Sequence, residues 1–473
     1  MTKCDKGLSF EDCELAILRQ AIDKIEAKVG ETMISNPRIT RIIDIVEDFL
    51  RKKKLICYGG TAINNILPLQ DQFYNRDTEL PDYDFFSTTP MEDAIELANM
   101  YHREKFEEVE AKAGVHYGTF KVFVEFIPVA DITLLPAELD RNLRKSAIKV
   151  DGILYTPPNY LRMSMYLELS RPKGDVSRWE KVLKRLTLLN KNYPMEDQLC
   201  QDITIQRLFT AKDIDEEEQE KIFTVTRDAL IGQGVVFFGA LANRLYMKYT
   251  RKYCRKSMSD IPDFDVLSRM PERTARVVKE QLQYHKIKHV KIVKRAGIGE
   301  VIAPHYEIKI GEETIVFVYE PLACHSYNTI KMDGKEVNIA TIDTMLSFYL
   351  AFVYVDRAYY DPRRILCMSE ILFKVQEQNR LKQRGVLKRF TMECYGKQQT
   401  LEDSRFEKTT KFKELKGERG TKEYEMYFLR YNPAGKRLKK RSSKKSGKKT
   451  TKKHAKGKKK KVRRRQTHRR RKI

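Results

Sequence analysis

The sequence predicts an α/β protein (α+β in the arrangement of its elements) with two related halves, each a mixed sheet flanked by helices. Amphipathic helical segments alternate with short apolar or alternating strand segments along most of the 473 residues. Four sequence landmarks of the first half also recur in the same order about 180 residues later. Solenoid repeats run to about 20–50 residues, so a repeat this long indicates a duplicated domain.

The four landmarks are short strings. "CYGGTAINNIL" resembles "FFGALANRLYM", and "LPDYDFFS" resembles "IPDFDVLS". Further on, "VHYGTFKVFVEFIPVAD" matches "PHYEIKIGEETIVFVYEPLAC", and "IKVDG" matches "IKMDG". We therefore predict domains at residues 1–200 and 201–392.

Within each half the predicted elements follow one order. An amphipathic helix, "PRITRIIDIVEDFLRKKK" or "DEEEQEKIFTVTRDALI", precedes a buried strand, a glycine and a short helix. A loop with Asp-x-Asp follows, then alternating strands such as "FKVFVEFIPVADIT". The helices "PNYLRMSMYLEL" and "SRWEKVLKRLTLLNKN" close the first half.

Positive charge is concentrated at the C-terminus. Residues 436–473 hold 23 Lys or Arg and no acid, which leaves 68 basic and 65 acidic residues elsewhere. We expect this tail to be disordered and to bind polyanions by counterion release. An RNA tether, a nuclear targeting run and a packaging tail all fit this composition. Residues 393–435 are predicted to be a charged connector that packs on the body and ends in a strand or turn, "YEMYFLRYNPAGKR".

Cysteine spacing and hydropathy indicate the cellular compartment in which the protein is expected to reside. The eight cysteines are scattered without a Cys-x-x-Cys pair, which favours free thiols in a reducing compartment over disulfides or a zinc site. The longest apolar stretch, "MLSFYLAFVYV", is shorter than the ~20 residues of a membrane span, and the N-terminus lacks a signal-peptide pattern. We expect a soluble intracellular protein without a membrane partner.

Two glycines stand between a predicted strand and a predicted helix. Gly59 and Gly60 would let backbone N–H groups approach a phosphate, and Thr61 offers a hydroxyl. Taken alone, such a pair is more often a tight turn.

Three aspartates follow in the first half. Asp82 and Asp84 are two residues apart, so on an extended backbone their carboxylates face the same way and repel each other unless a cation lies between them. A lone Asp-x-Asp is more often a solvated turn. Asp131, at the end of the apolar run "VFVEFIPVAD", completes a predicted three-carboxylate cluster that can hold two Mg²⁺ ions.

The order Gly-Gly-Thr, Asp-x-Asp and strand-borne Asp resembles the polymerase-β-type nucleotidyltransferases. The wider run "YGGTAINNILP", "LPDYDFFS", "VFVEFIPVADIT" and "YLRMSMYLELSRPKGDVSRWEKVLKRL" resembles the catalytic poly(A) polymerases of large cytoplasmic DNA viruses, of the mimivirus and poxvirus kind. This resemblance implies that Asp82 and Asp84 bind Mg²⁺ or Mn²⁺ at the phosphates of ATP. It implies that Asp131 binds the metal that activates an RNA 3′-OH.

The resemblance implies further roles and partners. The residues assigned to the nucleotide are Gly59, Gly60, Thr61, Arg178 and Lys181. Lys184 and Arg185 lie on the same basic helix, for which a solvated face is an equal alternative. Processivity is left open between a homodimer, a partner subunit and the tail, and the expected location is the viral factory in the host cytoplasm, with the virion left open. The alternatives are a uridylyl or CCA type of terminal transferase and a non-catalytic RNA-binding protein on the same fold.

The second half is predicted to be a degenerate copy. It keeps Asp263 and Asp265, but its glycine pair has become Gly239-Ala240 and the position aligned with Asp131 falls on Cys324. Without the third carboxylate we expect no chemistry there. The rival interpretation takes His325 as a substitute ligand, although a single His after an apolar strand is more often structural.

Overall fold

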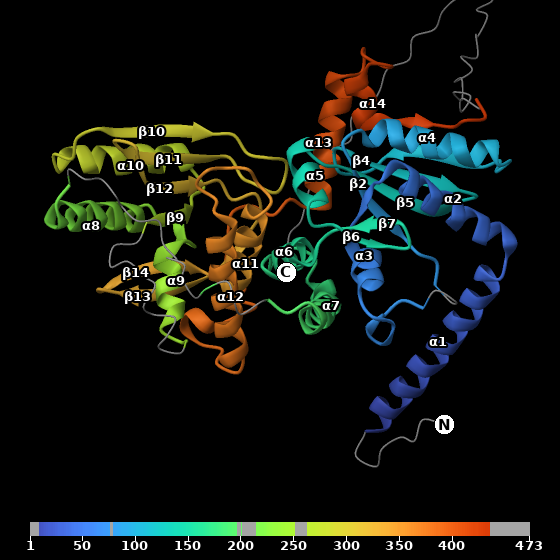
Figure 1. The fold of residues 1–473 in the computed structure, drawn as a ribbon, viewed down its shortest axis with the longest axis horizontal. Helices are drawn as coiled ribbons and strands as arrows, with labels where there is room; N and C mark the ends of the chain where they lie inside the picture. Colours follow the sequence, from blue (N-terminus) through green and yellow to red (C-terminus); the bar gives the residue numbers. More distant parts are fainter. Residues whose placement is uncertain (1–8, 76–78, 196–199, 201–213, 251–262, 436–473) are drawn as a thin grey trace, which may run out of the picture. The chain divides into compact units, whose positions relative to one another are not determined.

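The computed structural model describes residues 9–75, 79–195, 200, 214–250 and 263–435. The chain up to Ala434 forms one compact unit with two eight-stranded mixed sheets (Figure 1), which confirms the predicted fold class. The domain boundaries at residues 200 and 392 stay predictions. The basic tail, residues 436–473, lies outside the described residues.

The first sheet has the strand order β16-β3-β4-β5-β2-β1-β7-β6. Its strands are β1 (Ile56–Cys57), β2 (Tyr83–Ser87), β3 (Val109–Ala113), β4 (Thr119–Val124), β5 (Ile127–Leu134), β6 (Ile148–Val150), β7 (Ile153–Tyr155) and β16 (Arg430–Tyr431). The pairs β2–β5 and β1–β7 are parallel, and the other pairs are antiparallel. Parallel β2 and β5 therefore end at the same edge of the sheet.

The second sheet has the order β10-β11-β12-β9-β8-β14-β13-β15. Its strands are β8 (Val236–Phe237), β9 (Phe264–Leu267), β10 (Val290–Arg295), β11 (His305–Ile310), β12 (Glu313–Tyr319), β13 (His325–Met332), β14 (Lys335–Ala340) and β15 (Cys394–Tyr395). Seven strands repeat the first sheet in order, and β9–β12 and β8–β14 are parallel as β2–β5 and β1–β7 are. This repetition supports the predicted duplication.

The strand register corrects one predicted alignment. Asp84 on β2 lies opposite Asp131 on β5, and at the matching place Asp265 on β9 lies opposite Phe317 on β12. The counterpart of Asp131 is therefore Phe317, and the alignment with Cys324 was wrong. The β4–β5 and β11–β12 hairpins both have two-residue turns. Asp131 and Phe317 are each the fifth residue of the strand that follows the turn. The second apolar string is a few residues longer than the first, and these additional residues do not lie in the hairpin turn.

Helices fill the predicted places in the first half. They are α1 (Phe10–Ile34), α2 (Pro37–Lys53), α3 (Gly59–Ile66), α4 (Pro90–Arg103), α5 (Ala137–Arg144), α6 (Pro158–Leu169), α7 (Trp179–Asn192) and the 3-10 turns η1 (Leu69–Asp71) and η2 (Val176–Arg178). The helix α2 begins where Asn36 accepts a bond from the Arg38 amide, with Pro37 as its first residue. Its buried residues recur at helical spacing and pack into the core.

The second half is covered by α8 (Glu216–Gly232), α9 (Ala240–Met247), α10 (Pro271–Tyr284), α11 (Ile342–Phe352) and α12 (Pro362–Gln378). In Figure 1 the helices α8 and α10 lie side by side along β9–β12. The 3-10 turn η5 (Gly385–Leu387) precedes the connector, which contains α13 (Leu401–Glu414) and α14 (Lys422–Phe428). The segment predicted as a final strand or turn begins inside α14, and its residues Arg430–Tyr431 form the strand β16, which pairs with β3.

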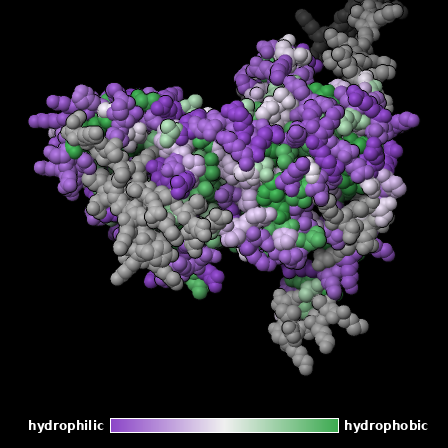
Figure 2. Space-filling model, viewed as in Figure 1, coloured by the Kyte–Doolittle hydropathy of each residue, from purple (hydrophilic) through white to green (hydrophobic). Residues whose placement is uncertain are grey.

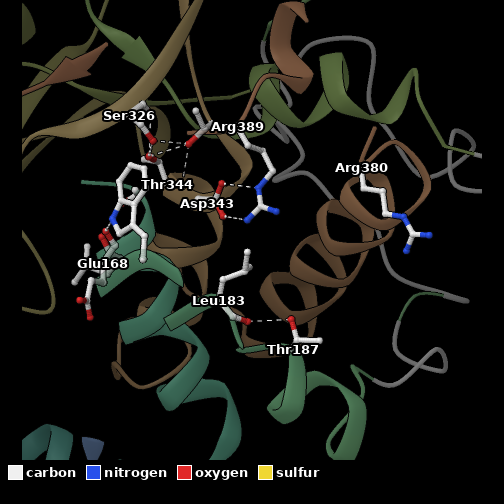
Figure 3. Close-up of polar contacts among 12 residues, drawn as sticks. Glu168, Leu183, Thr187, Ser326, Asp343, Thr344, Arg380 and Arg389 are labelled. Atoms are coloured by element: carbon white, nitrogen blue, oxygen red, sulfur yellow. Dashed lines mark hydrogen bonds and ion pairs between the residues drawn. The ribbon is translucent and has the colours of Figure 1, made fainter. Parts of the chain in front are cut away.

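The two sheets share a polar junction within this unit. α6 packs against α11, and the Ser326 amide donates to the Ser170 carbonyl at 2.8 Å. Figure 3 shows Asp343 of α11 held by two bonds from the Arg389 guanidinium, at 2.6 and 3.0 Å. The Ser326 hydroxyl bonds to Thr344 nearby, at 3.2 Å. The Asp343–Arg389 and Ser326–Thr344 contacts lie within the second half, and the Ser326–Ser170 bond is the one of the three that joins the halves.

The cysteines depart from the prediction of free thiols. Disulfides join Cys200 to Cys367 and Cys324 to Cys394, and Cys13 is also disulfide-bonded. The cysteines of the first pair are 167 residues apart and those of the second pair are 70 residues apart. Spacing along the chain therefore did not indicate these pairs, which form because α12 and β15 pack against distant parts of the chain. Among the described residues Cys57 is the free thiol, and it is buried.

The face drawn in Figure 2 is largely hydrophilic, and its apolar atoms form limited patches. In the part of the chain that the structure describes, every helix is too short or too polar to cross a lipid bilayer.

Candidate active site

Two of the predicted acids lie side by side. Asp84 of β2 and Asp131 of β5 are register partners on adjacent parallel strands. Asp82 stands two residues before Asp84, and the Tyr83 side chain between them is buried and donates to Glu47 on the other side of the strand. Because successive side chains alternate, Asp82 and Asp84 share the face opposite Tyr83.

The carboxylates act on one another electrostatically. Burial raises the pKa of Asp84 to about 7, and the charges of Asp82 and Asp131 add to the effect. Burial and the Asp131 charge also raise the pKa of Asp82. A cluster of this kind is stabilised by a cation.

Carboxylate oxygens are the ligands that Mg²⁺ and Mn²⁺ prefer, so the three acids are of the right donor type. No three acidic, His or Cys side chains of the described residues already stand together as a finished ligand set. The Lys121 ammonium of β4 contacts the Asp131 carboxylate. Asp82, Asp84 and Asp131 would hold a divalent cation once Asp131 is released from that contact.

The glycine pair is required by the packing around Asp84 and α3. Gly59 has φ +75°, and a Cβ added there would lie 2.6 Å from Asp84 Oδ2. A Cβ on Gly60 would lie 2.7 Å from Tyr74 Oη and 2.9 Å from Arg185 Nη1. Both glycines belong to the first turn of α3, where backbone N–H groups are unpaired within the helix. The first turn of α3 can therefore accept an anion at its backbone N–H groups, provided that positions 59 and 60 carry no side chain.

The Thr61 hydroxyl is hydrogen-bonded within the protein. Its side chain is buried and donates to the Asp82 carbonyl at 2.6 Å. The hydroxyl therefore fixes the loop that carries Asp82. A cavity of about 340 Å³ opens beside this contact, and its lining includes Asn64, Tyr74 and Glu79.

The basic helix brings three cations to this region. Arg178 lies 3.3 Å from Glu168, and its charge opposes the rise in the pKa of Asp84. Burial, followed by the charges of Arg185 and Arg178, lowers the pKa of Lys181. The three cations are three and four residues apart and so share one face of the helix.

Arg185 is the cation that reaches the glycines, and the site prediction did not include it. Its Nη2 donates to Tyr74 Oη at 2.6 Å, and its guanidinium lies 4.6 Å from the Phe73 ring centre. Lys184 points elsewhere, since it pairs with Glu180 at 2.7 Å and its side chain is 73% exposed. The seven-residue spacing from Arg178, about two helical turns, was the one signal in the sequence that favoured Arg185 over Lys184.

The second half keeps the shape of the site without its full set of acids. A Cβ on Gly239 would lie 2.2 Å from Asp265 Oδ2, which repeats the close approach at Gly59. Phe317 occupies the place of Asp131. His325 is buried on β13, with neither ring nitrogen hydrogen-bonded among the described residues, and burial, followed by the charge of Arg171, lowers its pKa to about 3. Strands β8 and β14 lie between β13 and β9, the strand that carries Asp265, so the rival interpretation of His325 as a substitute ligand gains no support.

Comparison with known proteins agrees with this geometry. Residues 44–175 match the family model described as poly(A) polymerase catalytic subunit, and this segment contains all three aspartates. Over part of its length the chain is similar to viral proteins named as poly(A) polymerase catalytic subunits. The crystal structure of the Megavirus polyadenylate synthase has the same fold, with a TM-score of 0.74 over 92% of this chain and 88% of that one, at 20% identity.

The sequence relatives cover less of the chain. A protein of Acanthamoeba polyphaga mimivirus named as a poly(A) polymerase catalytic subunit is 30% identical over 193 residues, 39% of this chain and 32% of that protein. The protein of the same name from African swine fever virus (isolate Pig/Kenya/KEN-50/1950) is 34% identical over 163 residues, 33% of this chain and 34% of that protein. The matched segments therefore span about a third of these relatives.

The raised pKa of Asp84 predicts an effect on stability. Between about pH 4 and pH 7 the folded chain holds a proton on Asp84 that the unfolded chain has released, so the free energy of unfolding falls as pH rises through this window. In EDTA at pH 8, Asp84→Asn is expected to be more stable than wild type by on the order of 2 kcal/mol. Urea unfolding at pH 8 and pH 4 measures this. An equal difference at both pH values would contradict it, because the gain should vanish at pH 4.

Proposed function

We propose that this chain is a template-independent poly(A) polymerase that adds AMP from ATP to the 3′-OH of RNA. The observation that carries the proposal is the pairing of Asp84 with Asp131 on adjacent strands, with Asp82 on the same face and the start of α3 packed against Asp84. Carboxylates beside an anion-accepting helix start suit the transfer of a nucleotidyl group.

The glycines of α3 and the nearby basic side chains bind ATP in the proposed reaction. Backbone N–H groups at Gly59 and Gly60, with Arg185, Lys181 and Arg178 nearby, bind and orient the triphosphate. The 3′-hydroxyl of RNA gives up its proton to water as its oxygen attacks the α-phosphorus of ATP, the bond from that phosphorus to the bridging oxygen of the β-phosphate breaks, and pyrophosphate leaves.

The three aspartates would hold two divalent cations, Mg²⁺ or Mn²⁺. Such ions supply Lewis-acid activation of the attacking hydroxyl and neutralise charge on the phosphates. Thr61 acts indirectly, since it holds the Asp82 loop in place.

Primer extension with each NTP tests the proposal. A short RNA incubated with full-length protein, Mg²⁺ or Mn²⁺, and one NTP at a time should be extended into long tails by ATP. Extension by UTP, or by CTP followed by ATP, would assign a uridylyl or CCA type of transferase. Salt-sensitive RNA binding without extension by any NTP would favour the non-catalytic RNA-binding protein.

Arg185 should contribute to ATP binding. In Arg185→Ala the cation that lies over Gly60 is gone, so we expect KM for ATP to rise about tenfold, the effect of losing one charge-assisted bond worth about 1.4 kcal/mol. Steady-state kinetics over a range of ATP concentrations measures this. Lys184→Ala is the matched control, because Lys184 pairs with Glu180 and is exposed. Equal effects of the two substitutions would remove Arg185 from the site.

Partners beyond ATP and RNA are also proposed. The relatives are named catalytic subunits, a name that implies a further subunit in those proteins. For this chain we propose that a second subunit or a second copy supports processive addition, which size measurements in solution with and without RNA would test.

A further inference from the structure

We propose that Lys121 is a positioning residue that serves as the resident cation of the aspartate cluster and competes with the divalent cation for Asp131. This inference rests on the proposed function and concerns how strongly the same site binds its metal. It makes Lys121 a determinant of metal affinity.

The position of Lys121 is fixed by strand pairing. Lys121 of β4 is the register partner of Asp131 of β5, which in turn is the register partner of Asp84 of β2. The side chains of directly opposed residues stand on the same face of a sheet. The Lys121 ammonium contacts Asp131 Oδ2, so it lies on the face that carries the cluster.

The contact is accessible to an ion from solution. The Lys121 side chain is 38% exposed and that of Asp131 is 21% exposed. An ion pair of this exposure is weak, because water screens both charges and the lysine side chain loses entropy when it is held. A divalent cation can therefore displace the ammonium from Asp131.

Lys121 differs from the other cation near the cluster. Arg178 has its own carboxylate partner, Glu168, at 3.3 Å. Among the described cations, Lys121 is the one that forms an ion pair with one of the three aspartates. While the ammonium stays on Asp131, it occupies Oδ2 of that carboxylate, and a metal has to displace it to bind there.

Lys112 provides a matched control one strand away. It is the register partner of Lys121 on β3 and is 37% exposed, but it pairs with Glu110 at 3.4 Å and lies 3.9 Å from the Phe123 ring centre. Removal of its charge changes the same sheet at the same exposure without touching the aspartates.

The experiment measures Mn²⁺ binding to the full-length protein in the absence of ATP and RNA, by electron paramagnetic resonance of free Mn²⁺. We expect Lys121→Met to bind Mn²⁺ about tenfold more tightly than wild type, the effect of removing one positive charge close to the ion in a partly exposed site. Lys121→Arg, which keeps the charge, and Lys112→Met should stay within about threefold of wild type. Asp131→Asn should weaken binding in the wild-type and Lys121→Met backgrounds alike.

The outcomes of this experiment distinguish the proposed role of Lys121 from the proposed poly(A) polymerase function. Unchanged Mn²⁺ affinity in Lys121→Met with an unchanged melting temperature would overturn the competition, and weaker affinity would overturn it too. If Lys121→Met fails to fold, Lys121→Gln serves in the same assay. The proposed function is judged apart from this, because primer extension can fail while the Mn²⁺ result stands. In a protein that does extend RNA, the Mn²⁺ concentration for half-maximal rate should fall about tenfold in Lys121→Met.

Discussion

Replacing Asp82 and Asp84 together by asparagine is expected to lower primer extension by at least about a thousandfold. Two of the three carboxylates that would hold the divalent cations are lost, and Lewis-acid stabilisation of the transition state amounts to several kcal/mol. The fold should survive, because burial and repulsion already disfavour the charges of these groups. Single-turnover extension of an RNA primer measures the loss, and thermal unfolding in EDTA reports the fold.

The matched control is the same double substitution in the second half, Asp263→Asn with Asp265→Asn. Phe317 stands where a third carboxylate would be needed there, so this variant should keep the activity of wild type per folded molecule. Added Mg²⁺ should raise the melting temperature of wild type and of this control, but not that of the Asp82 and Asp84 variant. Comparable losses of activity from both pairs would mean that the second half takes part in the chemistry.

Gly59→Ala is expected to lower kcat by about a hundredfold. The residue has φ +75°, a conformation that L residues adopt at a cost, and the new Cβ would lie 2.6 Å from Asp84 Oδ2. Asp84 must move, and a displacement of about 1 Å at a reacting centre is enough for a loss of this size. Rates normalised to the folded fraction, with kcat and KM determined separately, measure the effect.

Gly239→Ala is the control for steric damage. The added Cβ would lie 2.2 Å from Asp265 Oδ2, so the crowding is at least as severe, but it falls on the predicted degenerate copy. We expect a loss of stability in Gly239→Ala with near-normal kcat per folded molecule. If Gly239→Ala lowered kcat as strongly as Gly59→Ala, crowding in general, and not displacement of Asp84, would explain the first result.

Much of the architecture was available from local patterns. Helices α2, α6 and α7 were predicted because their apolar residues recur at helical spacing, and the glycine between β1 and α3 was visible because a strand stops there. Asp82 and Asp84 could be placed on one face because side chains alternate along an extended backbone. The paired hairpin turns at Asp151-Gly152 and Asp333-Gly334, all with positive φ, correspond to the repeated Asp-Gly strings.

What the sequence by itself determined is therefore the two-sheet α/β fold, its internal repeat and the three aspartates, because each depends on periodicity or on neighbours in the chain. Only the tertiary structure decided that Phe317 is the counterpart of Asp131, that Arg185 reaches Gly60, and that Lys121 contacts Asp131. Strand register, helix packing and disulfide pairing join residues that are distant in sequence, and contacts of that kind are set by how whole elements pack and leave no local pattern.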